Sequence, residues 1–267
     1  MLLEVAGLAR STFFYHQQRQ HRPDPHAELD GAIREAFTQA KGRYGHRRIH
    51  RQIRTAGHLV TKKTVLKRMR QLGLRCQVRR RKRFTTYRGE IGVAAPNRLN
   101  RTFTTTAPNQ TWVTDVTEFR IGDDKLYLSP VMDLFDRQII AYTVGHSPDL
   151  ALATTALRTA MTTLAPGEHP LVHSDQGFQY RHRAWHAHLA EVGAIPSMSR
   201  KGNCLDNAVI ESFFGHLKSE VLLDHFPTIT ALETAIHAYI RWYNHERTSA
   251  TLKGLSPVQY RAQALMP

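Results

Sequence analysis

Three acidic residues in the second half of the chain lie in three different local settings, and this arrangement strongly constrains the fold. Asp115 lies within an apolar-rich segment, TWVTDVTEF, that predicts a strand. Asp175 ends a short β-branched segment, PLVHSD, just before Gln176 and a glycine, and Glu211 lies in a helix-like segment, AVIESFFGHLKSE. The three positions are separated by 59 and 35 residues. They can share a site only if the chain folds back on itself.

Carboxylates that converge repel one another, so they need a cation between them. Sites built from hard oxygen ligands suit Mg²⁺ or Mn²⁺. Two such ions about 3.5–4 Å apart can hold both the attacking and the leaving oxygen of an in-line phosphoryl transfer. The pattern therefore predicts a metal-dependent site, with Mg²⁺ or Mn²⁺ as the cofactor and two ions as the expected number.

The segments between residues 105 and 225 alternate in a defined order. Three short-linked strand patterns, TWVTDVTEFRI, KLYLSPVMDLF and QIIAYTVGH, predict an antiparallel meander. A helix, a strand, a helix, a strand and a helix follow, and we expect the PLVHSD strand to run parallel to the first strand. This is the order of an RNase H-like α/β fold. The sequence thus predicts a mixed five-stranded sheet with flanking helices in a catalytic core over 105–225, and a C-terminal helix and tail over 226–267.

Composition excludes several classes of protein. The 267 residues, 41% of them hydrophobic, suffice for one or two domains with a buried core. No apolar run approaches the ~20 residues of a membrane span, and the N-terminus lacks the pattern of a secretory signal. Cys76 and Cys204 form no C-x-x-C pair, which favours a reducing cytoplasm over a disulfide framework. We therefore expect a cytoplasmic protein, associated with the nucleoid if it binds DNA.

The formal net charge of +15 is concentrated in the N-terminal part of the chain. Residues 1–100 contain 23 Lys and Arg but 6 Asp and Glu, whereas residues 101–267 contain 14 and 16. Such a basic block indicates a polyanionic partner, with affinity that falls steeply with salt. A solvated basic tail is the alternative. It fits less well, because the cations are interleaved with apolar residues at helical spacing.

The basic N-terminal part divides into three segments. Residues 1–22 hold a glycine turn and a serine-started helix, which fits either a partial helix-turn-helix or a capping helix. Residues 27–75 predict three helices, with Thr61 as the N-cap of the third. The second and third of these helices are short and are joined by a glycine-containing turn, and the third is strongly basic. We therefore predict a helix-turn-helix DNA-binding domain. Residues 76–104 form a basic linker that we expect to lie against DNA, with a disordered spacer as the alternative.

The candidate DNA-contact residues come from the third helix and the linker. Most of them would contact phosphate rather than bases, because phosphate contacts dominate such interfaces. They are Lys62, Lys63, Lys67, Arg68, Arg70, Arg79, Arg80, Arg81, Lys82 and Arg83.

Four segments, together with the spacing of the acids, resemble a known family. These are TWVTDVTEF, VHSDQGFQY, GNCLDNAVIESFFGHLKSE and WYNHERTSATLKGLSPVQY. In this order they resemble DDE transposases, most closely the second-reading-frame protein of the insertion sequence three family, whose catalytic core is retroviral-integrase-like. The similarity covers nearly the whole chain. It implies a polynucleotidyl transferase that binds element-end DNA and catalyses metal-dependent strand cleavage and 3′-hydroxyl strand transfer.

The resemblance also implies partners. These are double-stranded DNA, both element ends and target, and further copies of the chain in a synaptic complex. An upstream-frame protein is a further candidate partner, because translational frameshifting can supply it as a fusion in the family.

The resemblance assigns roles to residues by position. Asp115, Asp175 and Glu211 become the catalytic and metal-binding carboxylates. Lys218 lies two helical turns after Glu211, on the same face, and in the family a basic residue here contacts the DNA end near the cut. Residues expected to support the site, with loop capping as the alternative, are His173, Asn203 and Asn207.

Other acids fit structural roles better. Glu118 lies three residues after Asp115 on a strand and should face the opposite side of the sheet. Asp133 is likewise not expected to be catalytic, and Asp206 suits an N-cap of the helix that carries Glu211. In the tail motif, the sequence has Thr248-Ser249 where the family commonly has a histidine, so a tail histidine has no expected role.

Two other functions remain as alternatives. One is an RNase H-like nuclease that only hydrolyses, which would not need the basic N-terminal block. The other is a non-enzymatic DNA-binding regulator, which would be expected to have lost an acid, whereas this chain keeps all three.

Overall fold

The computed structural model describes residues 9–20, 26–76, 94–200, 204–221 and 226–266. The chain divides into two compact units, residues 1–77 and 78–267. Among the described residues, no helix is both long and apolar enough to cross a bilayer. The domain boundaries given above stay predictions.

The N-terminal unit contains the three helices predicted for residues 27–75. Their apolar faces pack on one another around Ile33, Ile49, Ile53 and Val65, all nearly inaccessible to solvent. The Thr61 hydroxyl accepts a hydrogen bond from the Thr64 amide at 3.2 Å, so the predicted N-cap is confirmed. The helices are α2 (Arg10–Gln20), which precedes them, then α3 (Ala27–Gln39), α4 (His46–Thr55) and α5 (Lys62–Gln71).

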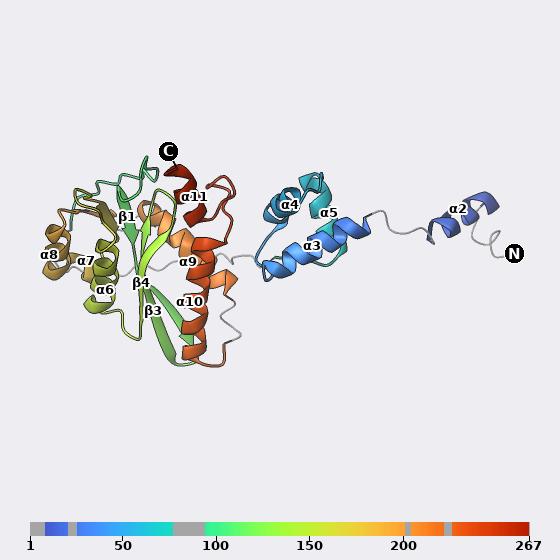
Figure 1. The fold of residues 1–267 in the computed structure, drawn as a ribbon. Coiled ribbons are helices and arrows are strands. Elements are labelled where there is room, and N and C mark those ends of the chain that lie inside the picture. Colours follow the sequence, from blue (N-terminus) through green and yellow to red (C-terminus); the bar gives the residue numbers. More distant parts are fainter. Residues whose placement is uncertain (1–8, 21–25, 77–93, 201–203, 222–225, 267) are drawn as a thin grey trace. The chain divides into compact units, whose positions relative to one another are not determined.

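The C-terminal unit is built on one mixed sheet (Figure 1). Its strand order is β2-β3-β1-β5-β6, and β4 pairs with β3. The predicted antiparallel meander is confirmed, and so is the parallel pairing of the strand before Asp175 with the strand before Asp115. The strands are β1 (Thr111–Thr114), β2 (Thr117–Ile121), β3 (Asp124–Asp133), β4 (Ile139–Gly145), β5 (Leu171–Ser174) and β6 (Ile195–Met198).

The sheet has six strands rather than five because one predicted strand is interrupted. β1 and β2 pair with β3 in a single continuous register, since Thr114 lies opposite Val131 and Thr117 opposite Leu128. That register places Asp115 opposite Pro130, which has no N–H to donate. Ladder hydrogen bonding therefore lapses at Asp115 and Val116, and the Val116 amide donates to the Asp115 carboxylate at 2.7 Å instead.

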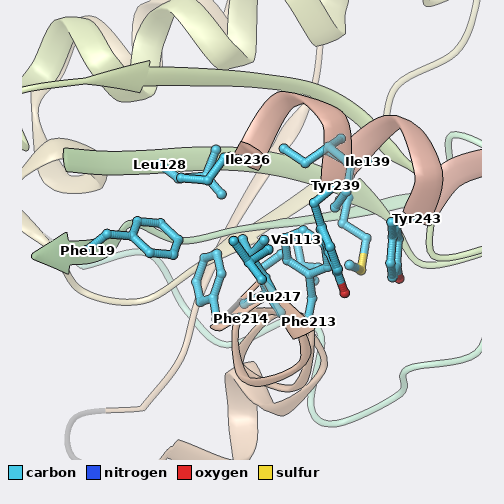
Figure 2. Close-up of a cluster of buried hydrophobic side chains, with 14 of the residues drawn as sticks. Val113, Phe119, Leu128, Ile139, Phe213, Phe214, Leu217, Ile236, Tyr239 and Tyr243 are labelled. Atoms are coloured by element: carbon cyan, nitrogen blue, oxygen red, sulfur yellow. The ribbon is translucent and has the colours of Figure 1, made fainter. Parts of the chain in front are cut away.

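Helices cover both faces of the sheet (Figure 1). One core joins Trp112 and Val131 to α6 and α8, and the other joins Val113 and Phe119 to α9 and α10 (Figure 2). Alternation along the strand puts Asp115 on the same face as Val113 and Phe119, the face that α9 covers. The elements are α6 (Leu150–Met161), α7 (Phe178–Arg181), α8 (Arg183–Glu191), the 3₁₀ turn η1 (Cys204–Asn207), α9 (Ala208–Glu220), α10 (Ile229–His245) and α11 (Pro257–Ala264).

The tail motif singled out in the sequence contributes structural contacts. Arg247 forms two hydrogen bonds, at 2.7 and 2.8 Å, with the carboxylate of Glu220 at the end of α9, which also accepts from the Tyr239 hydroxyl at 2.8 Å. The Asn244 amide bonds both backbone groups of Ile139 in β4. These contacts bind α9, α10 and the sheet edge together, so the motif holds the helix that carries Glu211 in place.

Candidate active site

Asp115 and Asp175 border one open pocket of about 240 Å³. Each follows the C-terminal end of a strand, and β1 and β5 are parallel neighbours with Trp112 opposite Val172. Extending that register by three residues puts Asp115 opposite Asp175. The sheet topology thus brings together two acids that are far apart in the sequence.

The two carboxylates share an unfavourable environment. Burial raises the pKa of Asp115 well above its ordinary value, and the nearby charges of Asp175 and Glu211 raise it further. The Val116 N–H and the Lys218 ammonium oppose this shift of the Asp115 pKa. Burial also raises the pKa of Asp175, against a hydrogen bond from the Gly177 N–H at 2.8 Å. Such a pair is stabilised by a proton or by a cation.

Glu211 and Lys218 both lie on α9, close enough to act on the Asp115 carboxylate. Lys218 places its ammonium 5.2 Å from the centre of the Phe119 ring. Glu211 is not among the described residues that line the pocket. Within the described ranges, no group of three or more His, Cys, Asp or Glu side chains could hold a metal ion. The structure therefore brings two of the acids together and leaves the third nearby.

A buried tyrosine beneath the carboxylates was missed in the sequence. Tyr180 from α7 lines the pocket, and its pKa is far above normal because of burial and the charges of Asp115 and Asp175. Thr114 and Ser129 carry buried hydroxyls near it, and none of the three hydroxyl groups has a well-formed hydrogen bond in the part of the chain described. Only the position of Thr114 beside Asp115 could have signalled this cluster.

His173 holds the strand that leads to Asp175. Its Nδ1 lies 2.9 Å from the Ser197 hydroxyl, which itself accepts from the backbone amides of Arg98 and Leu99. The hydroxyl proton is therefore directed to Nδ1. Burial lowers the pKa of His173 to about 4, so the ring is neutral at pH 7. His173 thus joins β5 to β6 and to the segment before the core.

The other two supporting residues differ in what the structure describes. Asn207 is buried at the start of α9, and its side chain makes no capping hydrogen bond there. Asn203 lies outside the described residues. Their supporting roles stay predictions.

The expectation that Asp206 caps α9 is wrong. Its carboxylate is fully buried and accepts from the side chains of Arg200, Arg101 and Asn97, each at 2.9 Å. These partners hold the pKa of Asp206 far below its ordinary value. Two cations and an amide outcompete the helix amides for this carboxylate. The residue instead ties the segment at 97–101 to the turn before Glu211.

Replacing Asp206 by Asn is expected to destabilise the protein by about 2 kcal/mol at pH 7, because charge-assisted hydrogen bonds are lost. Since the pKa is lower in the folded state, the carboxylate stabilises the fold above pH ~4, and this contribution falls as pH decreases. The difference in the free energy of unfolding between variant and wild type should be about 1 kcal/mol smaller at pH 3 than at pH 7. Urea unfolding at both pH values measures it. A difference independent of pH would contradict the account.

The remaining acids lie partly as expected. Asp133 is fully buried and paired with Arg261 at 2.7 Å, in a structural role. Glu118 borders the same pocket as Asp115, although its offset along the strand predicted a position away from the site. Its carboxylate accepts from the Tyr127 hydroxyl at 2.9 Å and lies 3.1 Å from the Lys125 ammonium. The pocket extends over the interrupted strand, which explains the difference.

The candidate DNA-contact residues of α5 divide into two groups. Arg68 is bound to Asp30 of α3, and its side chain is 14% exposed, so it helps to hold the helical unit together. The linker residues Arg79, Arg80, Arg81, Lys82 and Arg83 lie outside the described residues. The exposed cations of α5 are Lys62, Lys63, Lys67 and Arg70.

A methyl group at Gly177 would displace the Asp175 carboxylate. A Cβ built there would lie 2.9 Å from Asp175 Oδ1 and 2.8 Å from Gln179 Oε1, both ends of side chains that can move. The backbone of Gly177 is one that alanine adopts easily. Gly177→Ala is therefore expected to lower DNA cleavage on the order of 10-fold to 10²-fold, as a misplacement of about 1 Å does, while the melting temperature stays near wild type. A lower melting temperature that fully accounts for the loss of cleavage would contradict this prediction.

Comparison with known proteins defines the class. Two integrase core domain families match residues 105–204 and 211–265, and an HTH-like domain family matches residues 25–82. The sheet and the flanking helices thus belong to a DDE-type polynucleotidyl transferase with a helix-turn-helix-like domain. A simian T-cell lymphotropic virus intasome structure, in complex with PP2A regulatory subunit B56 gamma, shares the fold. Its TM-score is 0.50 at 17% identity, over 88% of this chain and 74% of that chain.

Two curated relatives define the family. The InsK protein of insertion sequence element IS150 from Escherichia coli (strain K12) is 47% identical over 267 residues, covering 100% of this chain and 94% of that protein. Transposase InsF of insertion sequence IS3A from the same strain is 33% identical over 99% of this chain and 94% of InsF. The chain belongs to this family of insertion-sequence transposases, and its function is that of a transposase.

Proposed function

We propose that Asp115, Asp175 and Glu211 together form the metal-binding site of this transposase, and that it cleaves and joins DNA at the ends of its own element. The observation that carries this is the pair of Asp115 and Asp175 at adjacent strand ends, with pKa values raised by burial and, for Asp115, by the neighbouring acids. Each carboxylate alone would fit a turn or a surface. Together, in one pocket, the Asp115 and Asp175 carboxylates form a cluster of negative charge that a cation would neutralise.

The donor set fits a hard divalent cation. Asp115 and Asp175 offer carboxylate oxygens on one wall of an open pocket, and Glu211 acts on Asp115 from the first turn of α9. Oxygen-only sites of this kind suit Mg²⁺ or Mn²⁺. We propose two ions, which when bound would neutralise charge on the phosphate and activate the attacking oxygen.

The chain's own residues then act by position and charge. Lys218, on the same helix as Glu211, would bind a DNA phosphate beside the carboxylates, which its influence on the pKa of Asp115 supports. Glu211, with Lys218 nearby, would complete the site when DNA and cations offset the repulsion among the acids. No serine, tyrosine or cysteine nucleophile is needed. Water attacks the phosphodiester at the element end and breaks its bond to the 3′-oxygen, which leaves as a 3′-hydroxyl. That hydroxyl then attacks a target phosphodiester and displaces the target strand's 3′-oxygen. Catalysis therefore rests on positioning and charge neutralisation.

The proposed partners follow from the proposed cleavage and joining of DNA. Double-stranded DNA of element ends and target would bind the helical unit, the linker and the core, and further copies of the chain would join in a synaptic complex. An upstream-frame protein is proposed as an additional partner. The proposed location is the bacterial cytoplasm, at the nucleoid. The helix-turn-helix-like domain and the basic N-terminal block support the DNA partner.

One assay separates the three candidate functions. Wild-type protein is incubated with labelled element ends, a target duplex and Mg²⁺, and the products are separated by size under denaturing conditions. Joined products support the transposase mechanism. Nicks without joining would support a nuclease that only hydrolyses, and bound but intact DNA would support a regulator. Either of these two results would contradict the proposal.

A further inference from the structure

Helix α4 carries a stripe of exposed arginines, none of which is among the predicted DNA-contact residues. Its buried face is formed by Ile49, His50 and Ile53. Arg47, Arg51 and Arg54 are all exposed, and their spacing of four and three residues places them on one face of the helix. The DNA-contact residues predicted from the sequence lie instead on the strongly basic third helix, α5, and in the linker.

The stripe lies in a part of the chain with no acidic residues. Residues 41–76 contain twelve Lys and Arg and not one Asp or Glu. Arg68 is ion-paired to Asp30, whereas Arg47, Arg51 and Arg54 form no ion pair with an acid among the described residues. Like charges three and four residues apart destabilise a helix by a few tenths of a kcal/mol per pair. The stripe is therefore unfavourable for the protein alone and favourable next to a polyanion.

The dimensions of the stripe match a DNA backbone. Arg47 and Arg54 are seven residues apart, a rise of about 10.5 Å along the helix axis. Phosphates on one DNA strand advance about 3.4 Å per base pair along the duplex axis, so a similar length spans about three base-pair steps, or four phosphates. Helix α5 shows the same spacing in Lys63, Lys67 and Arg70, which are also exposed. The helical unit thus presents two basic stripes of equal length, one on each helix of its helix-turn-helix.

We propose that the arginine stripe of α4, formed by Arg47, Arg51 and Arg54, binds the phosphate backbone of double-stranded DNA in addition to the contacts made by α5. This rests on the proposed function and deepens it, because it assigns a second contact surface of the helical unit. In helix-turn-helix proteins the first helix of the motif crosses the DNA backbone while the second enters the major groove. Phosphate contacts of this kind set position and affinity but not sequence preference.

The test is DNA binding by the full chain without divalent metal, so no catalysis is required. A labelled 30-base-pair duplex of arbitrary sequence is titrated with wild type and with the triple variant Arg47→Gln, Arg51→Gln, Arg54→Gln at several salt concentrations. The slope of log affinity against log salt is expected to become shallower by about 2.7, and affinity at about 0.1 M salt to fall on the order of 10²-fold. Glutamine is a good helix former, so α4 should persist, as circular dichroism checks.

Two further variants test whether the change in DNA binding depends on the position of the charges on α4. The triple variant Arg120→Gln, Arg158→Gln, Arg183→Gln changes net charge equally on exposed residues of the core and should leave the slope within about one of wild type. Lysine at positions 47, 51 and 54 should restore most of the affinity, because a phosphate accepts either cation. An unchanged slope in the α4 glutamine variant, or equal loss in the core variant, would overturn the proposal. Joining activity in wild type would still stand, so failure here is distinct from failure of the proposed mechanism.

Discussion

Asp115→Asn is expected to reduce DNA strand cleavage and joining by 10³-fold or more, a loss of about 4 kcal/mol of transition-state stabilisation. Asparagine keeps the shape of the side chain but removes the charge that would hold a cation. The same change should leave the fold intact or stabilise it, because it relieves the repulsion between Asp115 and the carboxylates of Asp175 and Glu211. The measurements are product formation on labelled element ends and the melting temperature. Reduced activity together with unreduced stability is a result that structural damage does not produce.

Glu118→Gln is the matched control for this prediction. It removes one negative charge from the same pocket, but from a carboxylate already bound by Tyr127 and Lys125. Cleavage should stay within about 10-fold of wild type, because the Glu118 side chain is solvent-exposed and its charge is already offset by Lys125, so its loss changes the field at Asp115 only weakly. Both variants should bind DNA as wild type does. Activity retained in Asp115→Asn, or lost equally in Glu118→Gln, would show that the catalytic acids are assigned wrongly.

Arg247→Met is expected to destabilise the protein by about 3–5 kcal/mol, the largest effect on stability that we predict. The Arg247 and Glu220 side chains are each 4% exposed, and removal of the arginine would leave the carboxylate buried without a compensating charge. The Tyr239 hydroxyl, which belongs to the cluster of Figure 2, would continue to donate to that carboxylate. Urea unfolding of the C-terminal unit measures the change in the free energy of unfolding.

The double variant Glu220→Gln, Arg247→Met tests the reason for that loss. With the buried charge gone, much of the stability should return, since replacing both partners of a buried pair is often close to neutral. If the double variant is as unstable as Arg247→Met, the loss comes from packing rather than from the uncompensated carboxylate. In either variant, any selective loss of cleavage would report movement of α9, which carries Glu211 and Lys218.

Much of the core could be predicted because its signals are local. Trp112 and Val113 alternate along β1, and each packs into a different one of the two cores. The order of strands and helices then limits the topology to one in which β1 and β5 are neighbours. Once they are parallel, the meeting of Asp115 and Asp175 follows from register alone.

The features that could not be predicted depend on partners distant in sequence. Asp206 looks like a helix cap, because nothing near it shows that Arg101 and Asn97 will reach it across about a hundred residues. Nothing near Arg68 in the sequence shows that α3 brings Asp30 to it. The split of the first strand required the cross-strand position of Pro130, which only the register reveals.

The central claim is that Asp115, Asp175 and Glu211 hold the same divalent cations, and metal-directed cleavage of the polypeptide tests it most directly. The DNA-bound transposase is loaded with Fe²⁺ in place of Mg²⁺, treated with ascorbate and peroxide, and the sites of chain breakage are mapped by mass spectrometry. We predict breaks near all three residues, each suppressed by excess Mg²⁺ and by Asp115→Asn. Breaks near residues 115 and 175 but none near 211, or breaks that Mg²⁺ does not suppress, would contradict the claim.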